Sequence, residues 1–398
     1  MPRIFSVIWI VIFLLFGLYN NSYAAIQYFS IDFHGSTVDL TFDDGMLYPY
    51  DIKVEEVALR QAYERLENRP YQLLLENIQT KAKELGLNDW LYGELVKKST
   101  EYLYEHSNVL KSELTTYLLL AKSGYDVRLT YRKSSVFVNI YVEETLYEIP
   151  LIEEGGRQYA SLSQKKSKSD PMISMFLLSH HPNPQGKVCS FRFEQWPAFC
   201  EKSSKRTISF VFEGQEIEFD INYSEDIAQL LTDYPLVDEY WYMEAPLSPQ
   251  LMKSLVPRLR NLIKGRSIQS SLELLVAFTR SGFVYKEDHY AFGKSKPMVA
   301  DELFFYPFSD CEDRSALFFS LVKELLDLPM IVIAYEDHLS IAVAFAGATG
   351  RAVNYKGRRY VFCDPTGPRS SSKIGIIPEG YENKDFEVLG MYNSGQTP

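Results

Sequence analysis

The chain has little cysteine and little histidine, four and six residues respectively among 398. So few cysteines in so long a chain exclude a small fold held together by disulfides. After the first 24 residues, no apolar run approaches the length of about 18 residues that a membrane-spanning helix needs. The sequence contains no Gly-rich phosphate-binding loop. The net charge is −11, which argues against nucleic acid or an anionic membrane surface as the main partner.

What is present is the composition of a folded protein with substantial hydrophobic cores. Hydrophobic residues make up 46% of the chain, and charged residues only 23%. A length of 398 residues exceeds one typical core, so two domains are expected. We predict an α+β fold in four parts: residues 1–24, a first domain at 25–163, a linker and extension at 164–204, and a second domain at 205–398.

Residues 1–24 have the features of a secretory signal peptide. Arg3 is the only charged residue before an apolar run from Ile4 to Leu18, and the small residues Ser22 and Ala24 suit a cleavage point after Ala24. The run is short for a membrane span, although an uncleaved anchor is the alternative interpretation. We therefore expect an exported protein, periplasmic or extracellular, that has no stable membrane span after cleavage.

The rest of the chain contains the same order of patterns twice. An alternating apolar and polar stretch around a glycine, typical of a β-hairpin, occurs at 30–40 and again about 180 residues later at 209–219. Helical stretches follow at 71–104 and 249–285. Later patterns recur at a spacing of about 200 residues, because the second copy carries about 20 additional residues within 286–310. We predict a tandem duplication; two unrelated α+β domains are the alternative.

The polar, basic stretch from Ser163 to Asp170 is predicted to link the two copies. The first copy is predicted to be degenerate. No cysteine in it matches Cys311, and the positions that correspond to His338 and Asp364 hold Ser135 and Ser163. Catalytic chemistry is therefore expected in the second half of the chain.

Cys311 is expected at the start of a helix. The preceding loop contains Pro307 and ends at Ser309 or Asp310, either of which is a natural N-cap, and leucines at four-residue spacing then define a buried face. A thiol in the first helical turn is favoured as a thiolate by the helix dipole and by nearby backbone N–H groups. The acidic residues on both sides of Cys311 oppose this effect, so the thiol needs a partner base.

His338 and Asp364 are the candidates for that partnership. His338 lies between two strand patterns, at the mouth of a predicted hairpin, and Asp364 ends a third strand pattern just before Pro365. On adjacent antiparallel strands the two side chains can face each other. An aspartate in that place fixes the tautomer of the histidine, which then shares a proton with the thiol of Cys311. Each residue alone is more often structural, and the ordered set of three is what favours a catalytic triad.

These motifs resemble a known family. Ser-Asp-Cys-Glu-Asp-Arg at 309–314, the histidine at 338 and Cys-Asp-Pro-Thr at 363–366 resemble the transglutaminase-like core of the papain-like cysteine hydrolase superfamily, in its exported bacterial form. The resemblance covers about residues 270–367. It implies a helix packed on an antiparallel sheet, with the cysteine as nucleophile, the histidine as general base and acid, and Asp364 as the orienting carboxylate.

Two positions depart from the family pattern. Leu339 follows the histidine where an aromatic residue is common within the next two positions, and Ser309 stands two residues before the cysteine where glycine is common. These departures argue against a transglutaminase in the strict sense. The form of the cysteine motif is more similar to the exported bacterial members, which are expected to be thiol hydrolases or are uncharacterised.

We therefore expect an exported, thiol-dependent acyl-transfer enzyme that needs no cofactor or metal. Its substrate would be an amide bond in a peptide, a protein or a peptidoglycan-type molecule, and nucleic acid is not expected as a partner. Hydrolysis is favoured over cross-linking because water is abundant outside the cell and the sequence indicates no amine-binding site. The alternative is a catalytically inactive transglutaminase-like protein that serves as a binding or scaffold module.

Four other features are given structural interpretations. Cys189 and Cys200 form either a disulfide or two independently buried thiols. The adjacent histidines at 180–181 are expected in a solvent-exposed loop and not at a metal site. Cys363 is expected to point into the core, opposite Asp364, by strand alternation. The aromatic residues at 240–242 are expected to pack in the core.

Overall fold

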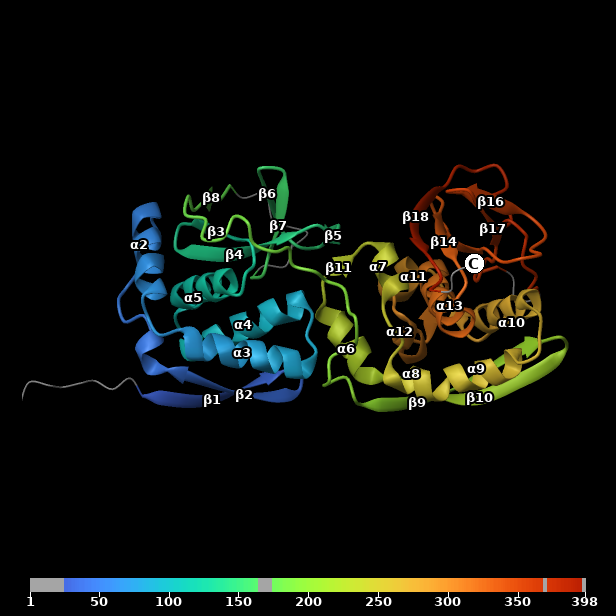
Figure 1. The fold of residues 1–398 in the computed structure, drawn as a ribbon, viewed down its shortest axis with the longest axis horizontal. Helices are drawn as coiled ribbons and strands as arrows, with labels where there is room; N and C mark the ends of the chain where they lie inside the picture. The colour runs from blue at the N-terminus through green and yellow to red at the C-terminus, as the bar shows by residue number, and fades with distance from the viewer. Residues whose placement is uncertain (1–24, 164–173, 368–370, 396–398) are drawn as a thin grey trace, which may run out of the picture.

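The computed structural model describes residues 25–163, 174–367 and 371–395. The two halves of the chain lie side by side along the longest axis of the molecule, and each has a β-hairpin on one side, helices in the middle and a five-stranded sheet on the other side (Figure 1). The predicted signal peptide and all but Ser163 of the polar stretch predicted to link the two copies, 163–170, lie outside the described residues. The fold is thus α+β with two similarly arranged halves, as predicted.

The first half begins with the hairpin predicted around Gly35. Strands β1 (Ile26–Phe33) and β2 (Ser36–Asp43) pair antiparallel through a turn in which His34 and Gly35 both have positive φ, the backbone conformation that the commonest two-residue hairpin turn requires. The short 3-10 turn η1 (Asp44–Met46) follows. The helices of this half are α2 (Glu56–Glu67), α3 (Gln72–Leu85), α4 (Asp89–Leu103) and α5 (Val109–Lys122).

The first sheet includes a strand that follows the predicted linker. Its antiparallel order is β6-β7-β4-β3-β8, and β8 (Phe176–Leu177) pairs with β3 (Val127–Arg132) at one edge. Beyond β8, Cys189 and Phe191 are fully buried. The segment 174–200 is therefore part of the first half in space. The remaining strands are β4 (Ser135–Val142), β5 (Leu146–Tyr147), which lies outside this sheet, β6 (Leu151–Glu154) and β7 (Arg157–Ser161).

The second half repeats the plan. The hairpin predicted around Gly214 is formed by β9 (Ser203–Phe212) and β10 (Gln215–Ser224). The helices are α6 (Glu225–Asp233), α7 (Glu239–Glu244), α8 (Pro249–Ser254), α9 (Val256–Ile263), α10 (Ile268–Ser281), α11 (Asp288–Phe292), α12 (Ala300–Phe305) and α13 (Cys311–Leu326). The sheet consists of β14 (Met330–Ala334), β15 (Leu339–Val343), β16 (Ala352–Tyr355), β17 (Arg358–Phe362) and β18 (Glu387–Tyr392).

The two five-stranded sheets have the same strand order. The second is β16-β17-β15-β14-β18, which matches the first strand for strand when each is numbered along its own half. The additional residues of the second half lie between α10 and α13, where β12 (Val284–Tyr285), α11, α12 and β13 (Phe308–Ser309) are inserted. In the first half, α4 and α5 are separated only by residues 104–108. This arrangement is the one that a tandem duplication would produce, and the duplication stays a prediction.

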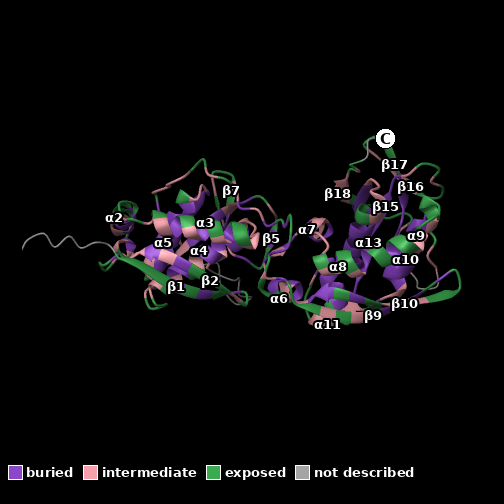
Figure 2. Cartoon of the chain, turned by 60° about the horizontal axis from the view of Figure 1, so that its bottom comes forward, coloured by how far each residue is buried: buried purple, intermediate pink, exposed green. Residues whose placement is uncertain are grey.

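The halves are joined by strand pairing and by polar contacts. β5 of the first half pairs antiparallel with β11 (Leu236–Val237) of the second. Lys294 Nζ lies 3.2 Å from Glu148 Oε2, across the same junction. Buried residues occur in the helices and strands of both halves (Figure 2), and the buried hydrophobic residues form one main cluster. The segment at 240–242 contributes to it, with Trp241 and Tyr242 buried and Tyr240 packed against the cluster, as predicted.

The histidines at 180–181 correct one prediction, because they are not in a solvent-exposed loop. His181 Nε2 lies 2.6 Å from Oδ1 of Asp126, whose side chain is fully buried. Arg157 and Tyr159 also donate hydrogen bonds to Asp126. A buried carboxylate needs such partners, and this need draws His181 inward.

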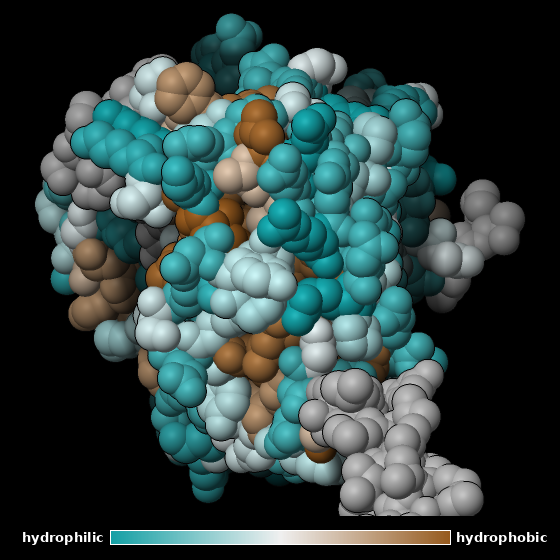
Figure 3. Space-filling view, turned by 90° about the vertical axis from the view of Figure 1, so that its left-hand side faces the viewer, coloured by the Kyte–Doolittle hydropathy of each residue, from teal (hydrophilic) through white to brown (hydrophobic). Residues whose placement is uncertain are grey.

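Of the two interpretations of Cys189 and Cys200, the structure supports two buried thiols. Cys189 and Cys200 are free and buried, so the candidate disulfide is absent. Cys363 is buried as predicted. None of the helices in the described part of the chain is long and apolar enough to cross a membrane. On the face that Figure 3 shows, at the end of the molecule formed by the first half, apolar side chains occur in separate small groups among hydrophilic ones.

Candidate active site

Cys311 is the first residue of α13, as the sequence predicted. Asp310 is the N-cap, and its backbone N–H donates a 3.0 Å hydrogen bond to Oδ2 of Asp313 in the first turn. The predicted apolar face is buried, with Leu317 and Leu321 in the core. Core packing of this face fixes the direction of the helix, so its N-terminus and the thiol are held in place.

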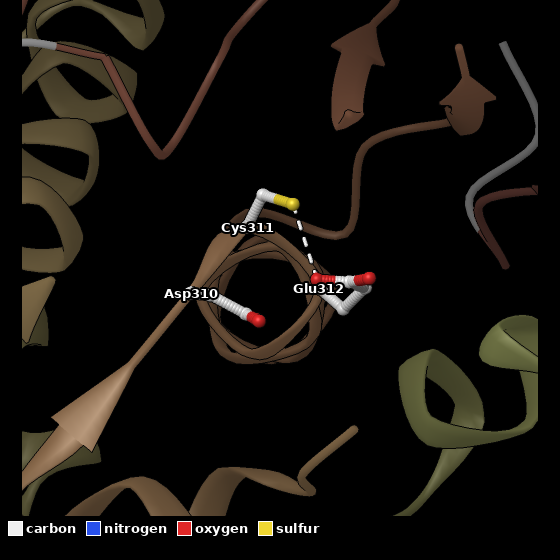
Figure 4. A group of neighbouring side chains, drawn as sticks. All are labelled: Asp310, Cys311 and Glu312. Atoms are coloured by element: carbon white, nitrogen blue, oxygen red, sulfur yellow. Dashed lines mark hydrogen bonds between the residues drawn. The ribbon is translucent and has the colours of Figure 1, made fainter. Parts of the chain in front are cut away.

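The thiol of Cys311 contacts the neighbouring carboxylate. Sγ donates a hydrogen bond to Glu312 Oε2 at 3.1 Å, and Figure 4 shows the thiol turned toward Glu312 while Asp310 lies across the end of the helix. Burial raises the pKa of the thiol well above its ordinary value, and the charges of Glu312 and Asp310 raise it further. A backbone hydrogen bond from Leu339 acts in the opposite direction. The arrangement as it stands favours a protonated thiol.

A group of buried carboxylates lies beneath the start of α13. Asp288, Asp310 and Asp313 have oxygen atoms within 4.8 Å of one another. Burial first, and the charges of the neighbouring acidic residues second, raise the pKa of both Asp310 and Asp313 far above the ordinary range. At neutral pH this group therefore holds protons, and Glu312 is the larger source of negative charge next to the thiol.

Two groups of side chains have ligand atoms close enough together to hold a metal ion. One is the buried carboxylate group just described, and the other is Asp310 with Cys311 and Glu312. Both oxygens of Asp313 already accept backbone hydrogen bonds, from Met298 and Asp310. These bonds fix both ends of the segment 298–310, which contains α12 and β13, to the helix and account for Asp313 without an ion.

His338 lies where the hairpin of β14 and β15 turns, as predicted. The backbone N–H of Tyr335 donates to the carbonyl oxygen of His338 at 2.8 Å and closes the turn. The ring of Tyr381 packs against the imidazole with 4.9 Å between centroids. The next residue, Leu339, reaches the thiol of Cys311 through its backbone hydrogen bond, so the histidine and the cysteine border the same site. Among the described residues, no hydrogen bond joins His338 to Cys311 directly.

Asp364 faces His338 from the end of β17. Its Oδ1 lies 3.3 Å from His338 Nε2 and accepts a 2.8 Å hydrogen bond from the hydroxyl of Thr366. Its Oδ2 lies 3.6 Å from Nη2 of Arg280, which comes from α10. Burial alone would raise the pKa of Asp364, but the hydrogen bond and charge of His338, followed by the charge of Arg280, lower it below its ordinary value. Asp364 is thus an ionised carboxylate between His338 and Arg280.

The three residues that the sequence predicted lie in one region of the structure, and several side chains that contact them were not predicted. Arg280, Thr366, Tyr381 and the Glu312 contact were not predicted. Thr366 belongs to the Cys-Asp-Pro-Thr motif, so its hydrogen bond to Asp364 could have been predicted from the sequence. Arg280 lies on helix α10, 84 positions before Asp364 in the sequence. An arginine on a helix is ordinarily solvent-exposed, and no local sequence pattern predicts that this one is buried against Asp364.

Two cavities of about 740 Å³ each lie away from this site. One is in the first half, beside the start of α4, and includes Asp89 and Tyr125. The other lies between the halves and includes Trp90 and Tyr242. Neither is lined by a residue of the candidate triad, so these two cavities are separate from the candidate site.

No family model, curated protein or solved structure matches this chain. The resemblance to transglutaminase-like proteins therefore rests on its three sequence motifs.

Proposed function

We propose that the protein is a transglutaminase-like cysteine hydrolase that is exported and cleaves an amide bond in a peptide, a protein or a peptidoglycan-type substrate. The observation that carries the proposal is the pair formed by His338 Nε2 and the buried, ionised Asp364, 3.3 Å apart, beside the helix that begins at Cys311. The buried pair of His181 and Asp126 in the first half is structural, and what distinguishes His338 is that the next residue, Leu339, forms a backbone hydrogen bond with the thiol of Cys311.

The geometry assigns the two ring nitrogens different roles. Because Nε2 of His338 faces Asp364, Nδ1 is the nitrogen that remains for the thiol of Cys311. In the reaction His338 takes the thiol proton, the sulfur of Cys311 bonds to the substrate carbonyl carbon, and the amine leaves with that proton. Water, activated by the same imidazole, then hydrolyses the thioester and restores the thiol. The imidazolium is stabilised throughout by Asp364.

Glu312 sets the condition for the first step. The thiol donates its proton to the Glu312 carboxylate and not to the imidazole, so this hydrogen bond must break before His338 can accept the proton. Substrate that occupies the space next to Glu312 would favour that break.

A second candidate function is a non-catalytic binding or scaffold module. The observation that favours it is the same hydrogen bond to Glu312, together with the raised pKa of the Cys311 thiol. On this hypothesis Cys311, His338 and Asp364 have only a structural role, and the thiol stays protonated at every physiological pH.

The alkylation rate of Cys311 as a function of pH separates the two. The chain from Ala25 onward would be treated with iodoacetamide, with Cys311→Ser as the blank for the other three thiols, all of which are buried. If His338 pairs with the thiol, the wild type reacts below the ordinary thiol pKa of about 8.5, and His338→Ala loses that reactivity. Equal profiles for the two proteins would exclude the enzyme and favour the scaffold.

A further inference from the structure

Arg280 contacts both the main chain and the carboxylate of Asp364. It lies in the last turn of α10, and its side chain is 7% exposed. Its Nε and Nη2 both donate to the backbone carbonyl oxygen of Asp364, at 3.0 and 2.6 Å. Nη2 also lies 3.6 Å from the Oδ2 carboxylate oxygen of the same residue. One guanidinium thus holds Asp364 at two points.

The same guanidinium fixes the chain beyond the aspartate. Nη1 donates to the carbonyl oxygen of Ser371 at 2.5 Å, so Arg280 ties together residues seven positions apart after β17. Gly367 lies against it, because a Cβ at that position would come within 2.7 Å of the guanidinium carbon. A glycine at 367 is what allows the arginine to occupy this place.

The two oxygens of Asp364 are divided between two partners. Oδ1 faces His338, Thr366 and Ser340, whereas Oδ2 faces only Arg280 among the described residues. The guanidinium fork fixes the backbone of Asp364 through two hydrogen bonds to its carbonyl oxygen and places a positive charge beside Oδ2, which leaves Oδ1 directed at the imidazole. Burial of an arginine is costly unless such partners are present, which indicates a specific role and not incidental packing.

We propose that Arg280 is the positioning residue of the candidate site, which keeps the Asp364 carboxylate ionised and directed at His338. This inference rests on the proposed function. It concerns the pairing of Asp364 with His338, which can be measured without substrate turnover. Arg280 touches no reacting atom and acts only through Asp364.

The test follows the ring titration of His338 by NMR in histidine-labelled protein, with the resonance assigned from His338→Ala. Loss of Arg280 releases Asp364, and a released or neutral carboxylate stabilises the imidazolium less. We therefore expect Arg280→Gln to lower the midpoint of the His338 titration by about one pH unit, a tenfold change in the protonation equilibrium. Arg280→Lys, which keeps the charge but not the fork, should lower it less.

Two further variants keep the test decisive. Gly367→Ala retains the arginine but displaces its guanidinium, and should shift the titration in the same direction as Arg280→Gln. Arg128→Gln is the matched control, because Arg128 is also buried and donates to the carboxylate of Glu154, at 2.9 Å, but in the other half. It should destabilise the protein and leave the His338 titration unchanged.

An unchanged midpoint in Arg280→Gln would overturn the proposal. A raised midpoint would do the same, since it would mean that Arg280 acts on His338 only as a repelling positive charge. Should Arg280→Gln not fold, Arg280→Lys and Gly367→Ala decide by the same criterion. The proposed function is judged separately, by the alkylation profiles of wild type and His338→Ala, so failure of one is distinguishable from failure of the other.

Discussion

The thiol of Cys311 and the carboxylate of Glu312, adjacent in sequence, are joined by a hydrogen bond of 3.1 Å. The bond places a negative charge against the sulfur that the proposed reaction needs as an anion. It therefore stabilises the protonated thiol, and the reactivity of Cys311 depends on how strongly this contact competes with His338.

Removal of the Glu312 charge should activate the thiol. In Glu312→Gln the pKa of Cys311 is expected to fall by about one unit, so the alkylation rate at neutral pH should rise about tenfold. Glu324→Gln is the matched control, because Glu324 is an exposed acid near the other end of the same helix. A rate in Glu312→Gln no greater than in this control would show that the carboxylate does not restrain the thiol.

The buried acids beneath α13 should make stability depend on pH. Folding raises the pKa of Asp310 and Asp313, so the stability that these groups contribute is present at low pH and is lost as the pH rises toward the folded-state pKa values. Asp310→Asn cannot ionise and retains a good N-cap. We expect it to raise the free energy of unfolding by about 1 kcal/mol or more at pH 8 and by much less at pH 5, measured with urea. An equal gain at both pH values would contradict the assignment of protons to this group.

The pairing of His181 with Asp126 should matter for stability and not for chemistry. Asp126→Ala leaves Arg157 and His181 without their buried partner, and a loss of about 3 kcal/mol is expected in urea unfolding. The comparison is His34→Ala, which removes a half-exposed pair with Glu94 and should cost less than about 1 kcal/mol. Similar losses of stability in both variants would mean that the buried ion pairs of Asp126 contribute no more to the free energy of unfolding than the half-exposed pair of His34 and Glu94.

Thiol counting should distinguish Cys311 from the other cysteines. All four cysteines are buried and free in the native protein, and burial raises the pKa of each, but Cys311 alone among them lies in the candidate site with His338. We expect Ellman's reagent to titrate at most one thiol in the folded wild type, none in Cys311→Ser, and all four after denaturation of the wild type. Two thiols after denaturation would instead reveal a disulfide between Cys189 and Cys200.

Much of the framework could be predicted because its signals are local. Gly35 and Gly214 mark their hairpins by the turn conformation that they permit, and the leucine spacing after Cys311 fixes the helix and its buried face. Asp364 could be placed because Pro365 follows it at the end of a strand. In each case a few neighbouring residues determine the backbone, whatever the rest of the chain does.

The features that could not be predicted depend on distant partners or on side-chain rotation. Nothing near His181 in sequence shows that a fully buried aspartate lies at position 126. The same is true of Arg280, whose partner is on another layer of the fold. The direction of the Cys311 thiol is a choice among staggered conformations of one bond, which spacing and periodicity do not determine.

The pairing of β8 with β3 means that the boundary of the first half in space does not coincide with its boundary along the chain. A fragment that ends at residue 163 would lack an edge strand of its own sheet, together with Cys189 and Phe191 from its core. A fragment that begins at residue 174 would carry that strand and those side chains without the surfaces that cover them. Expression of either half alone therefore calls for a cut near residue 202, just before β9.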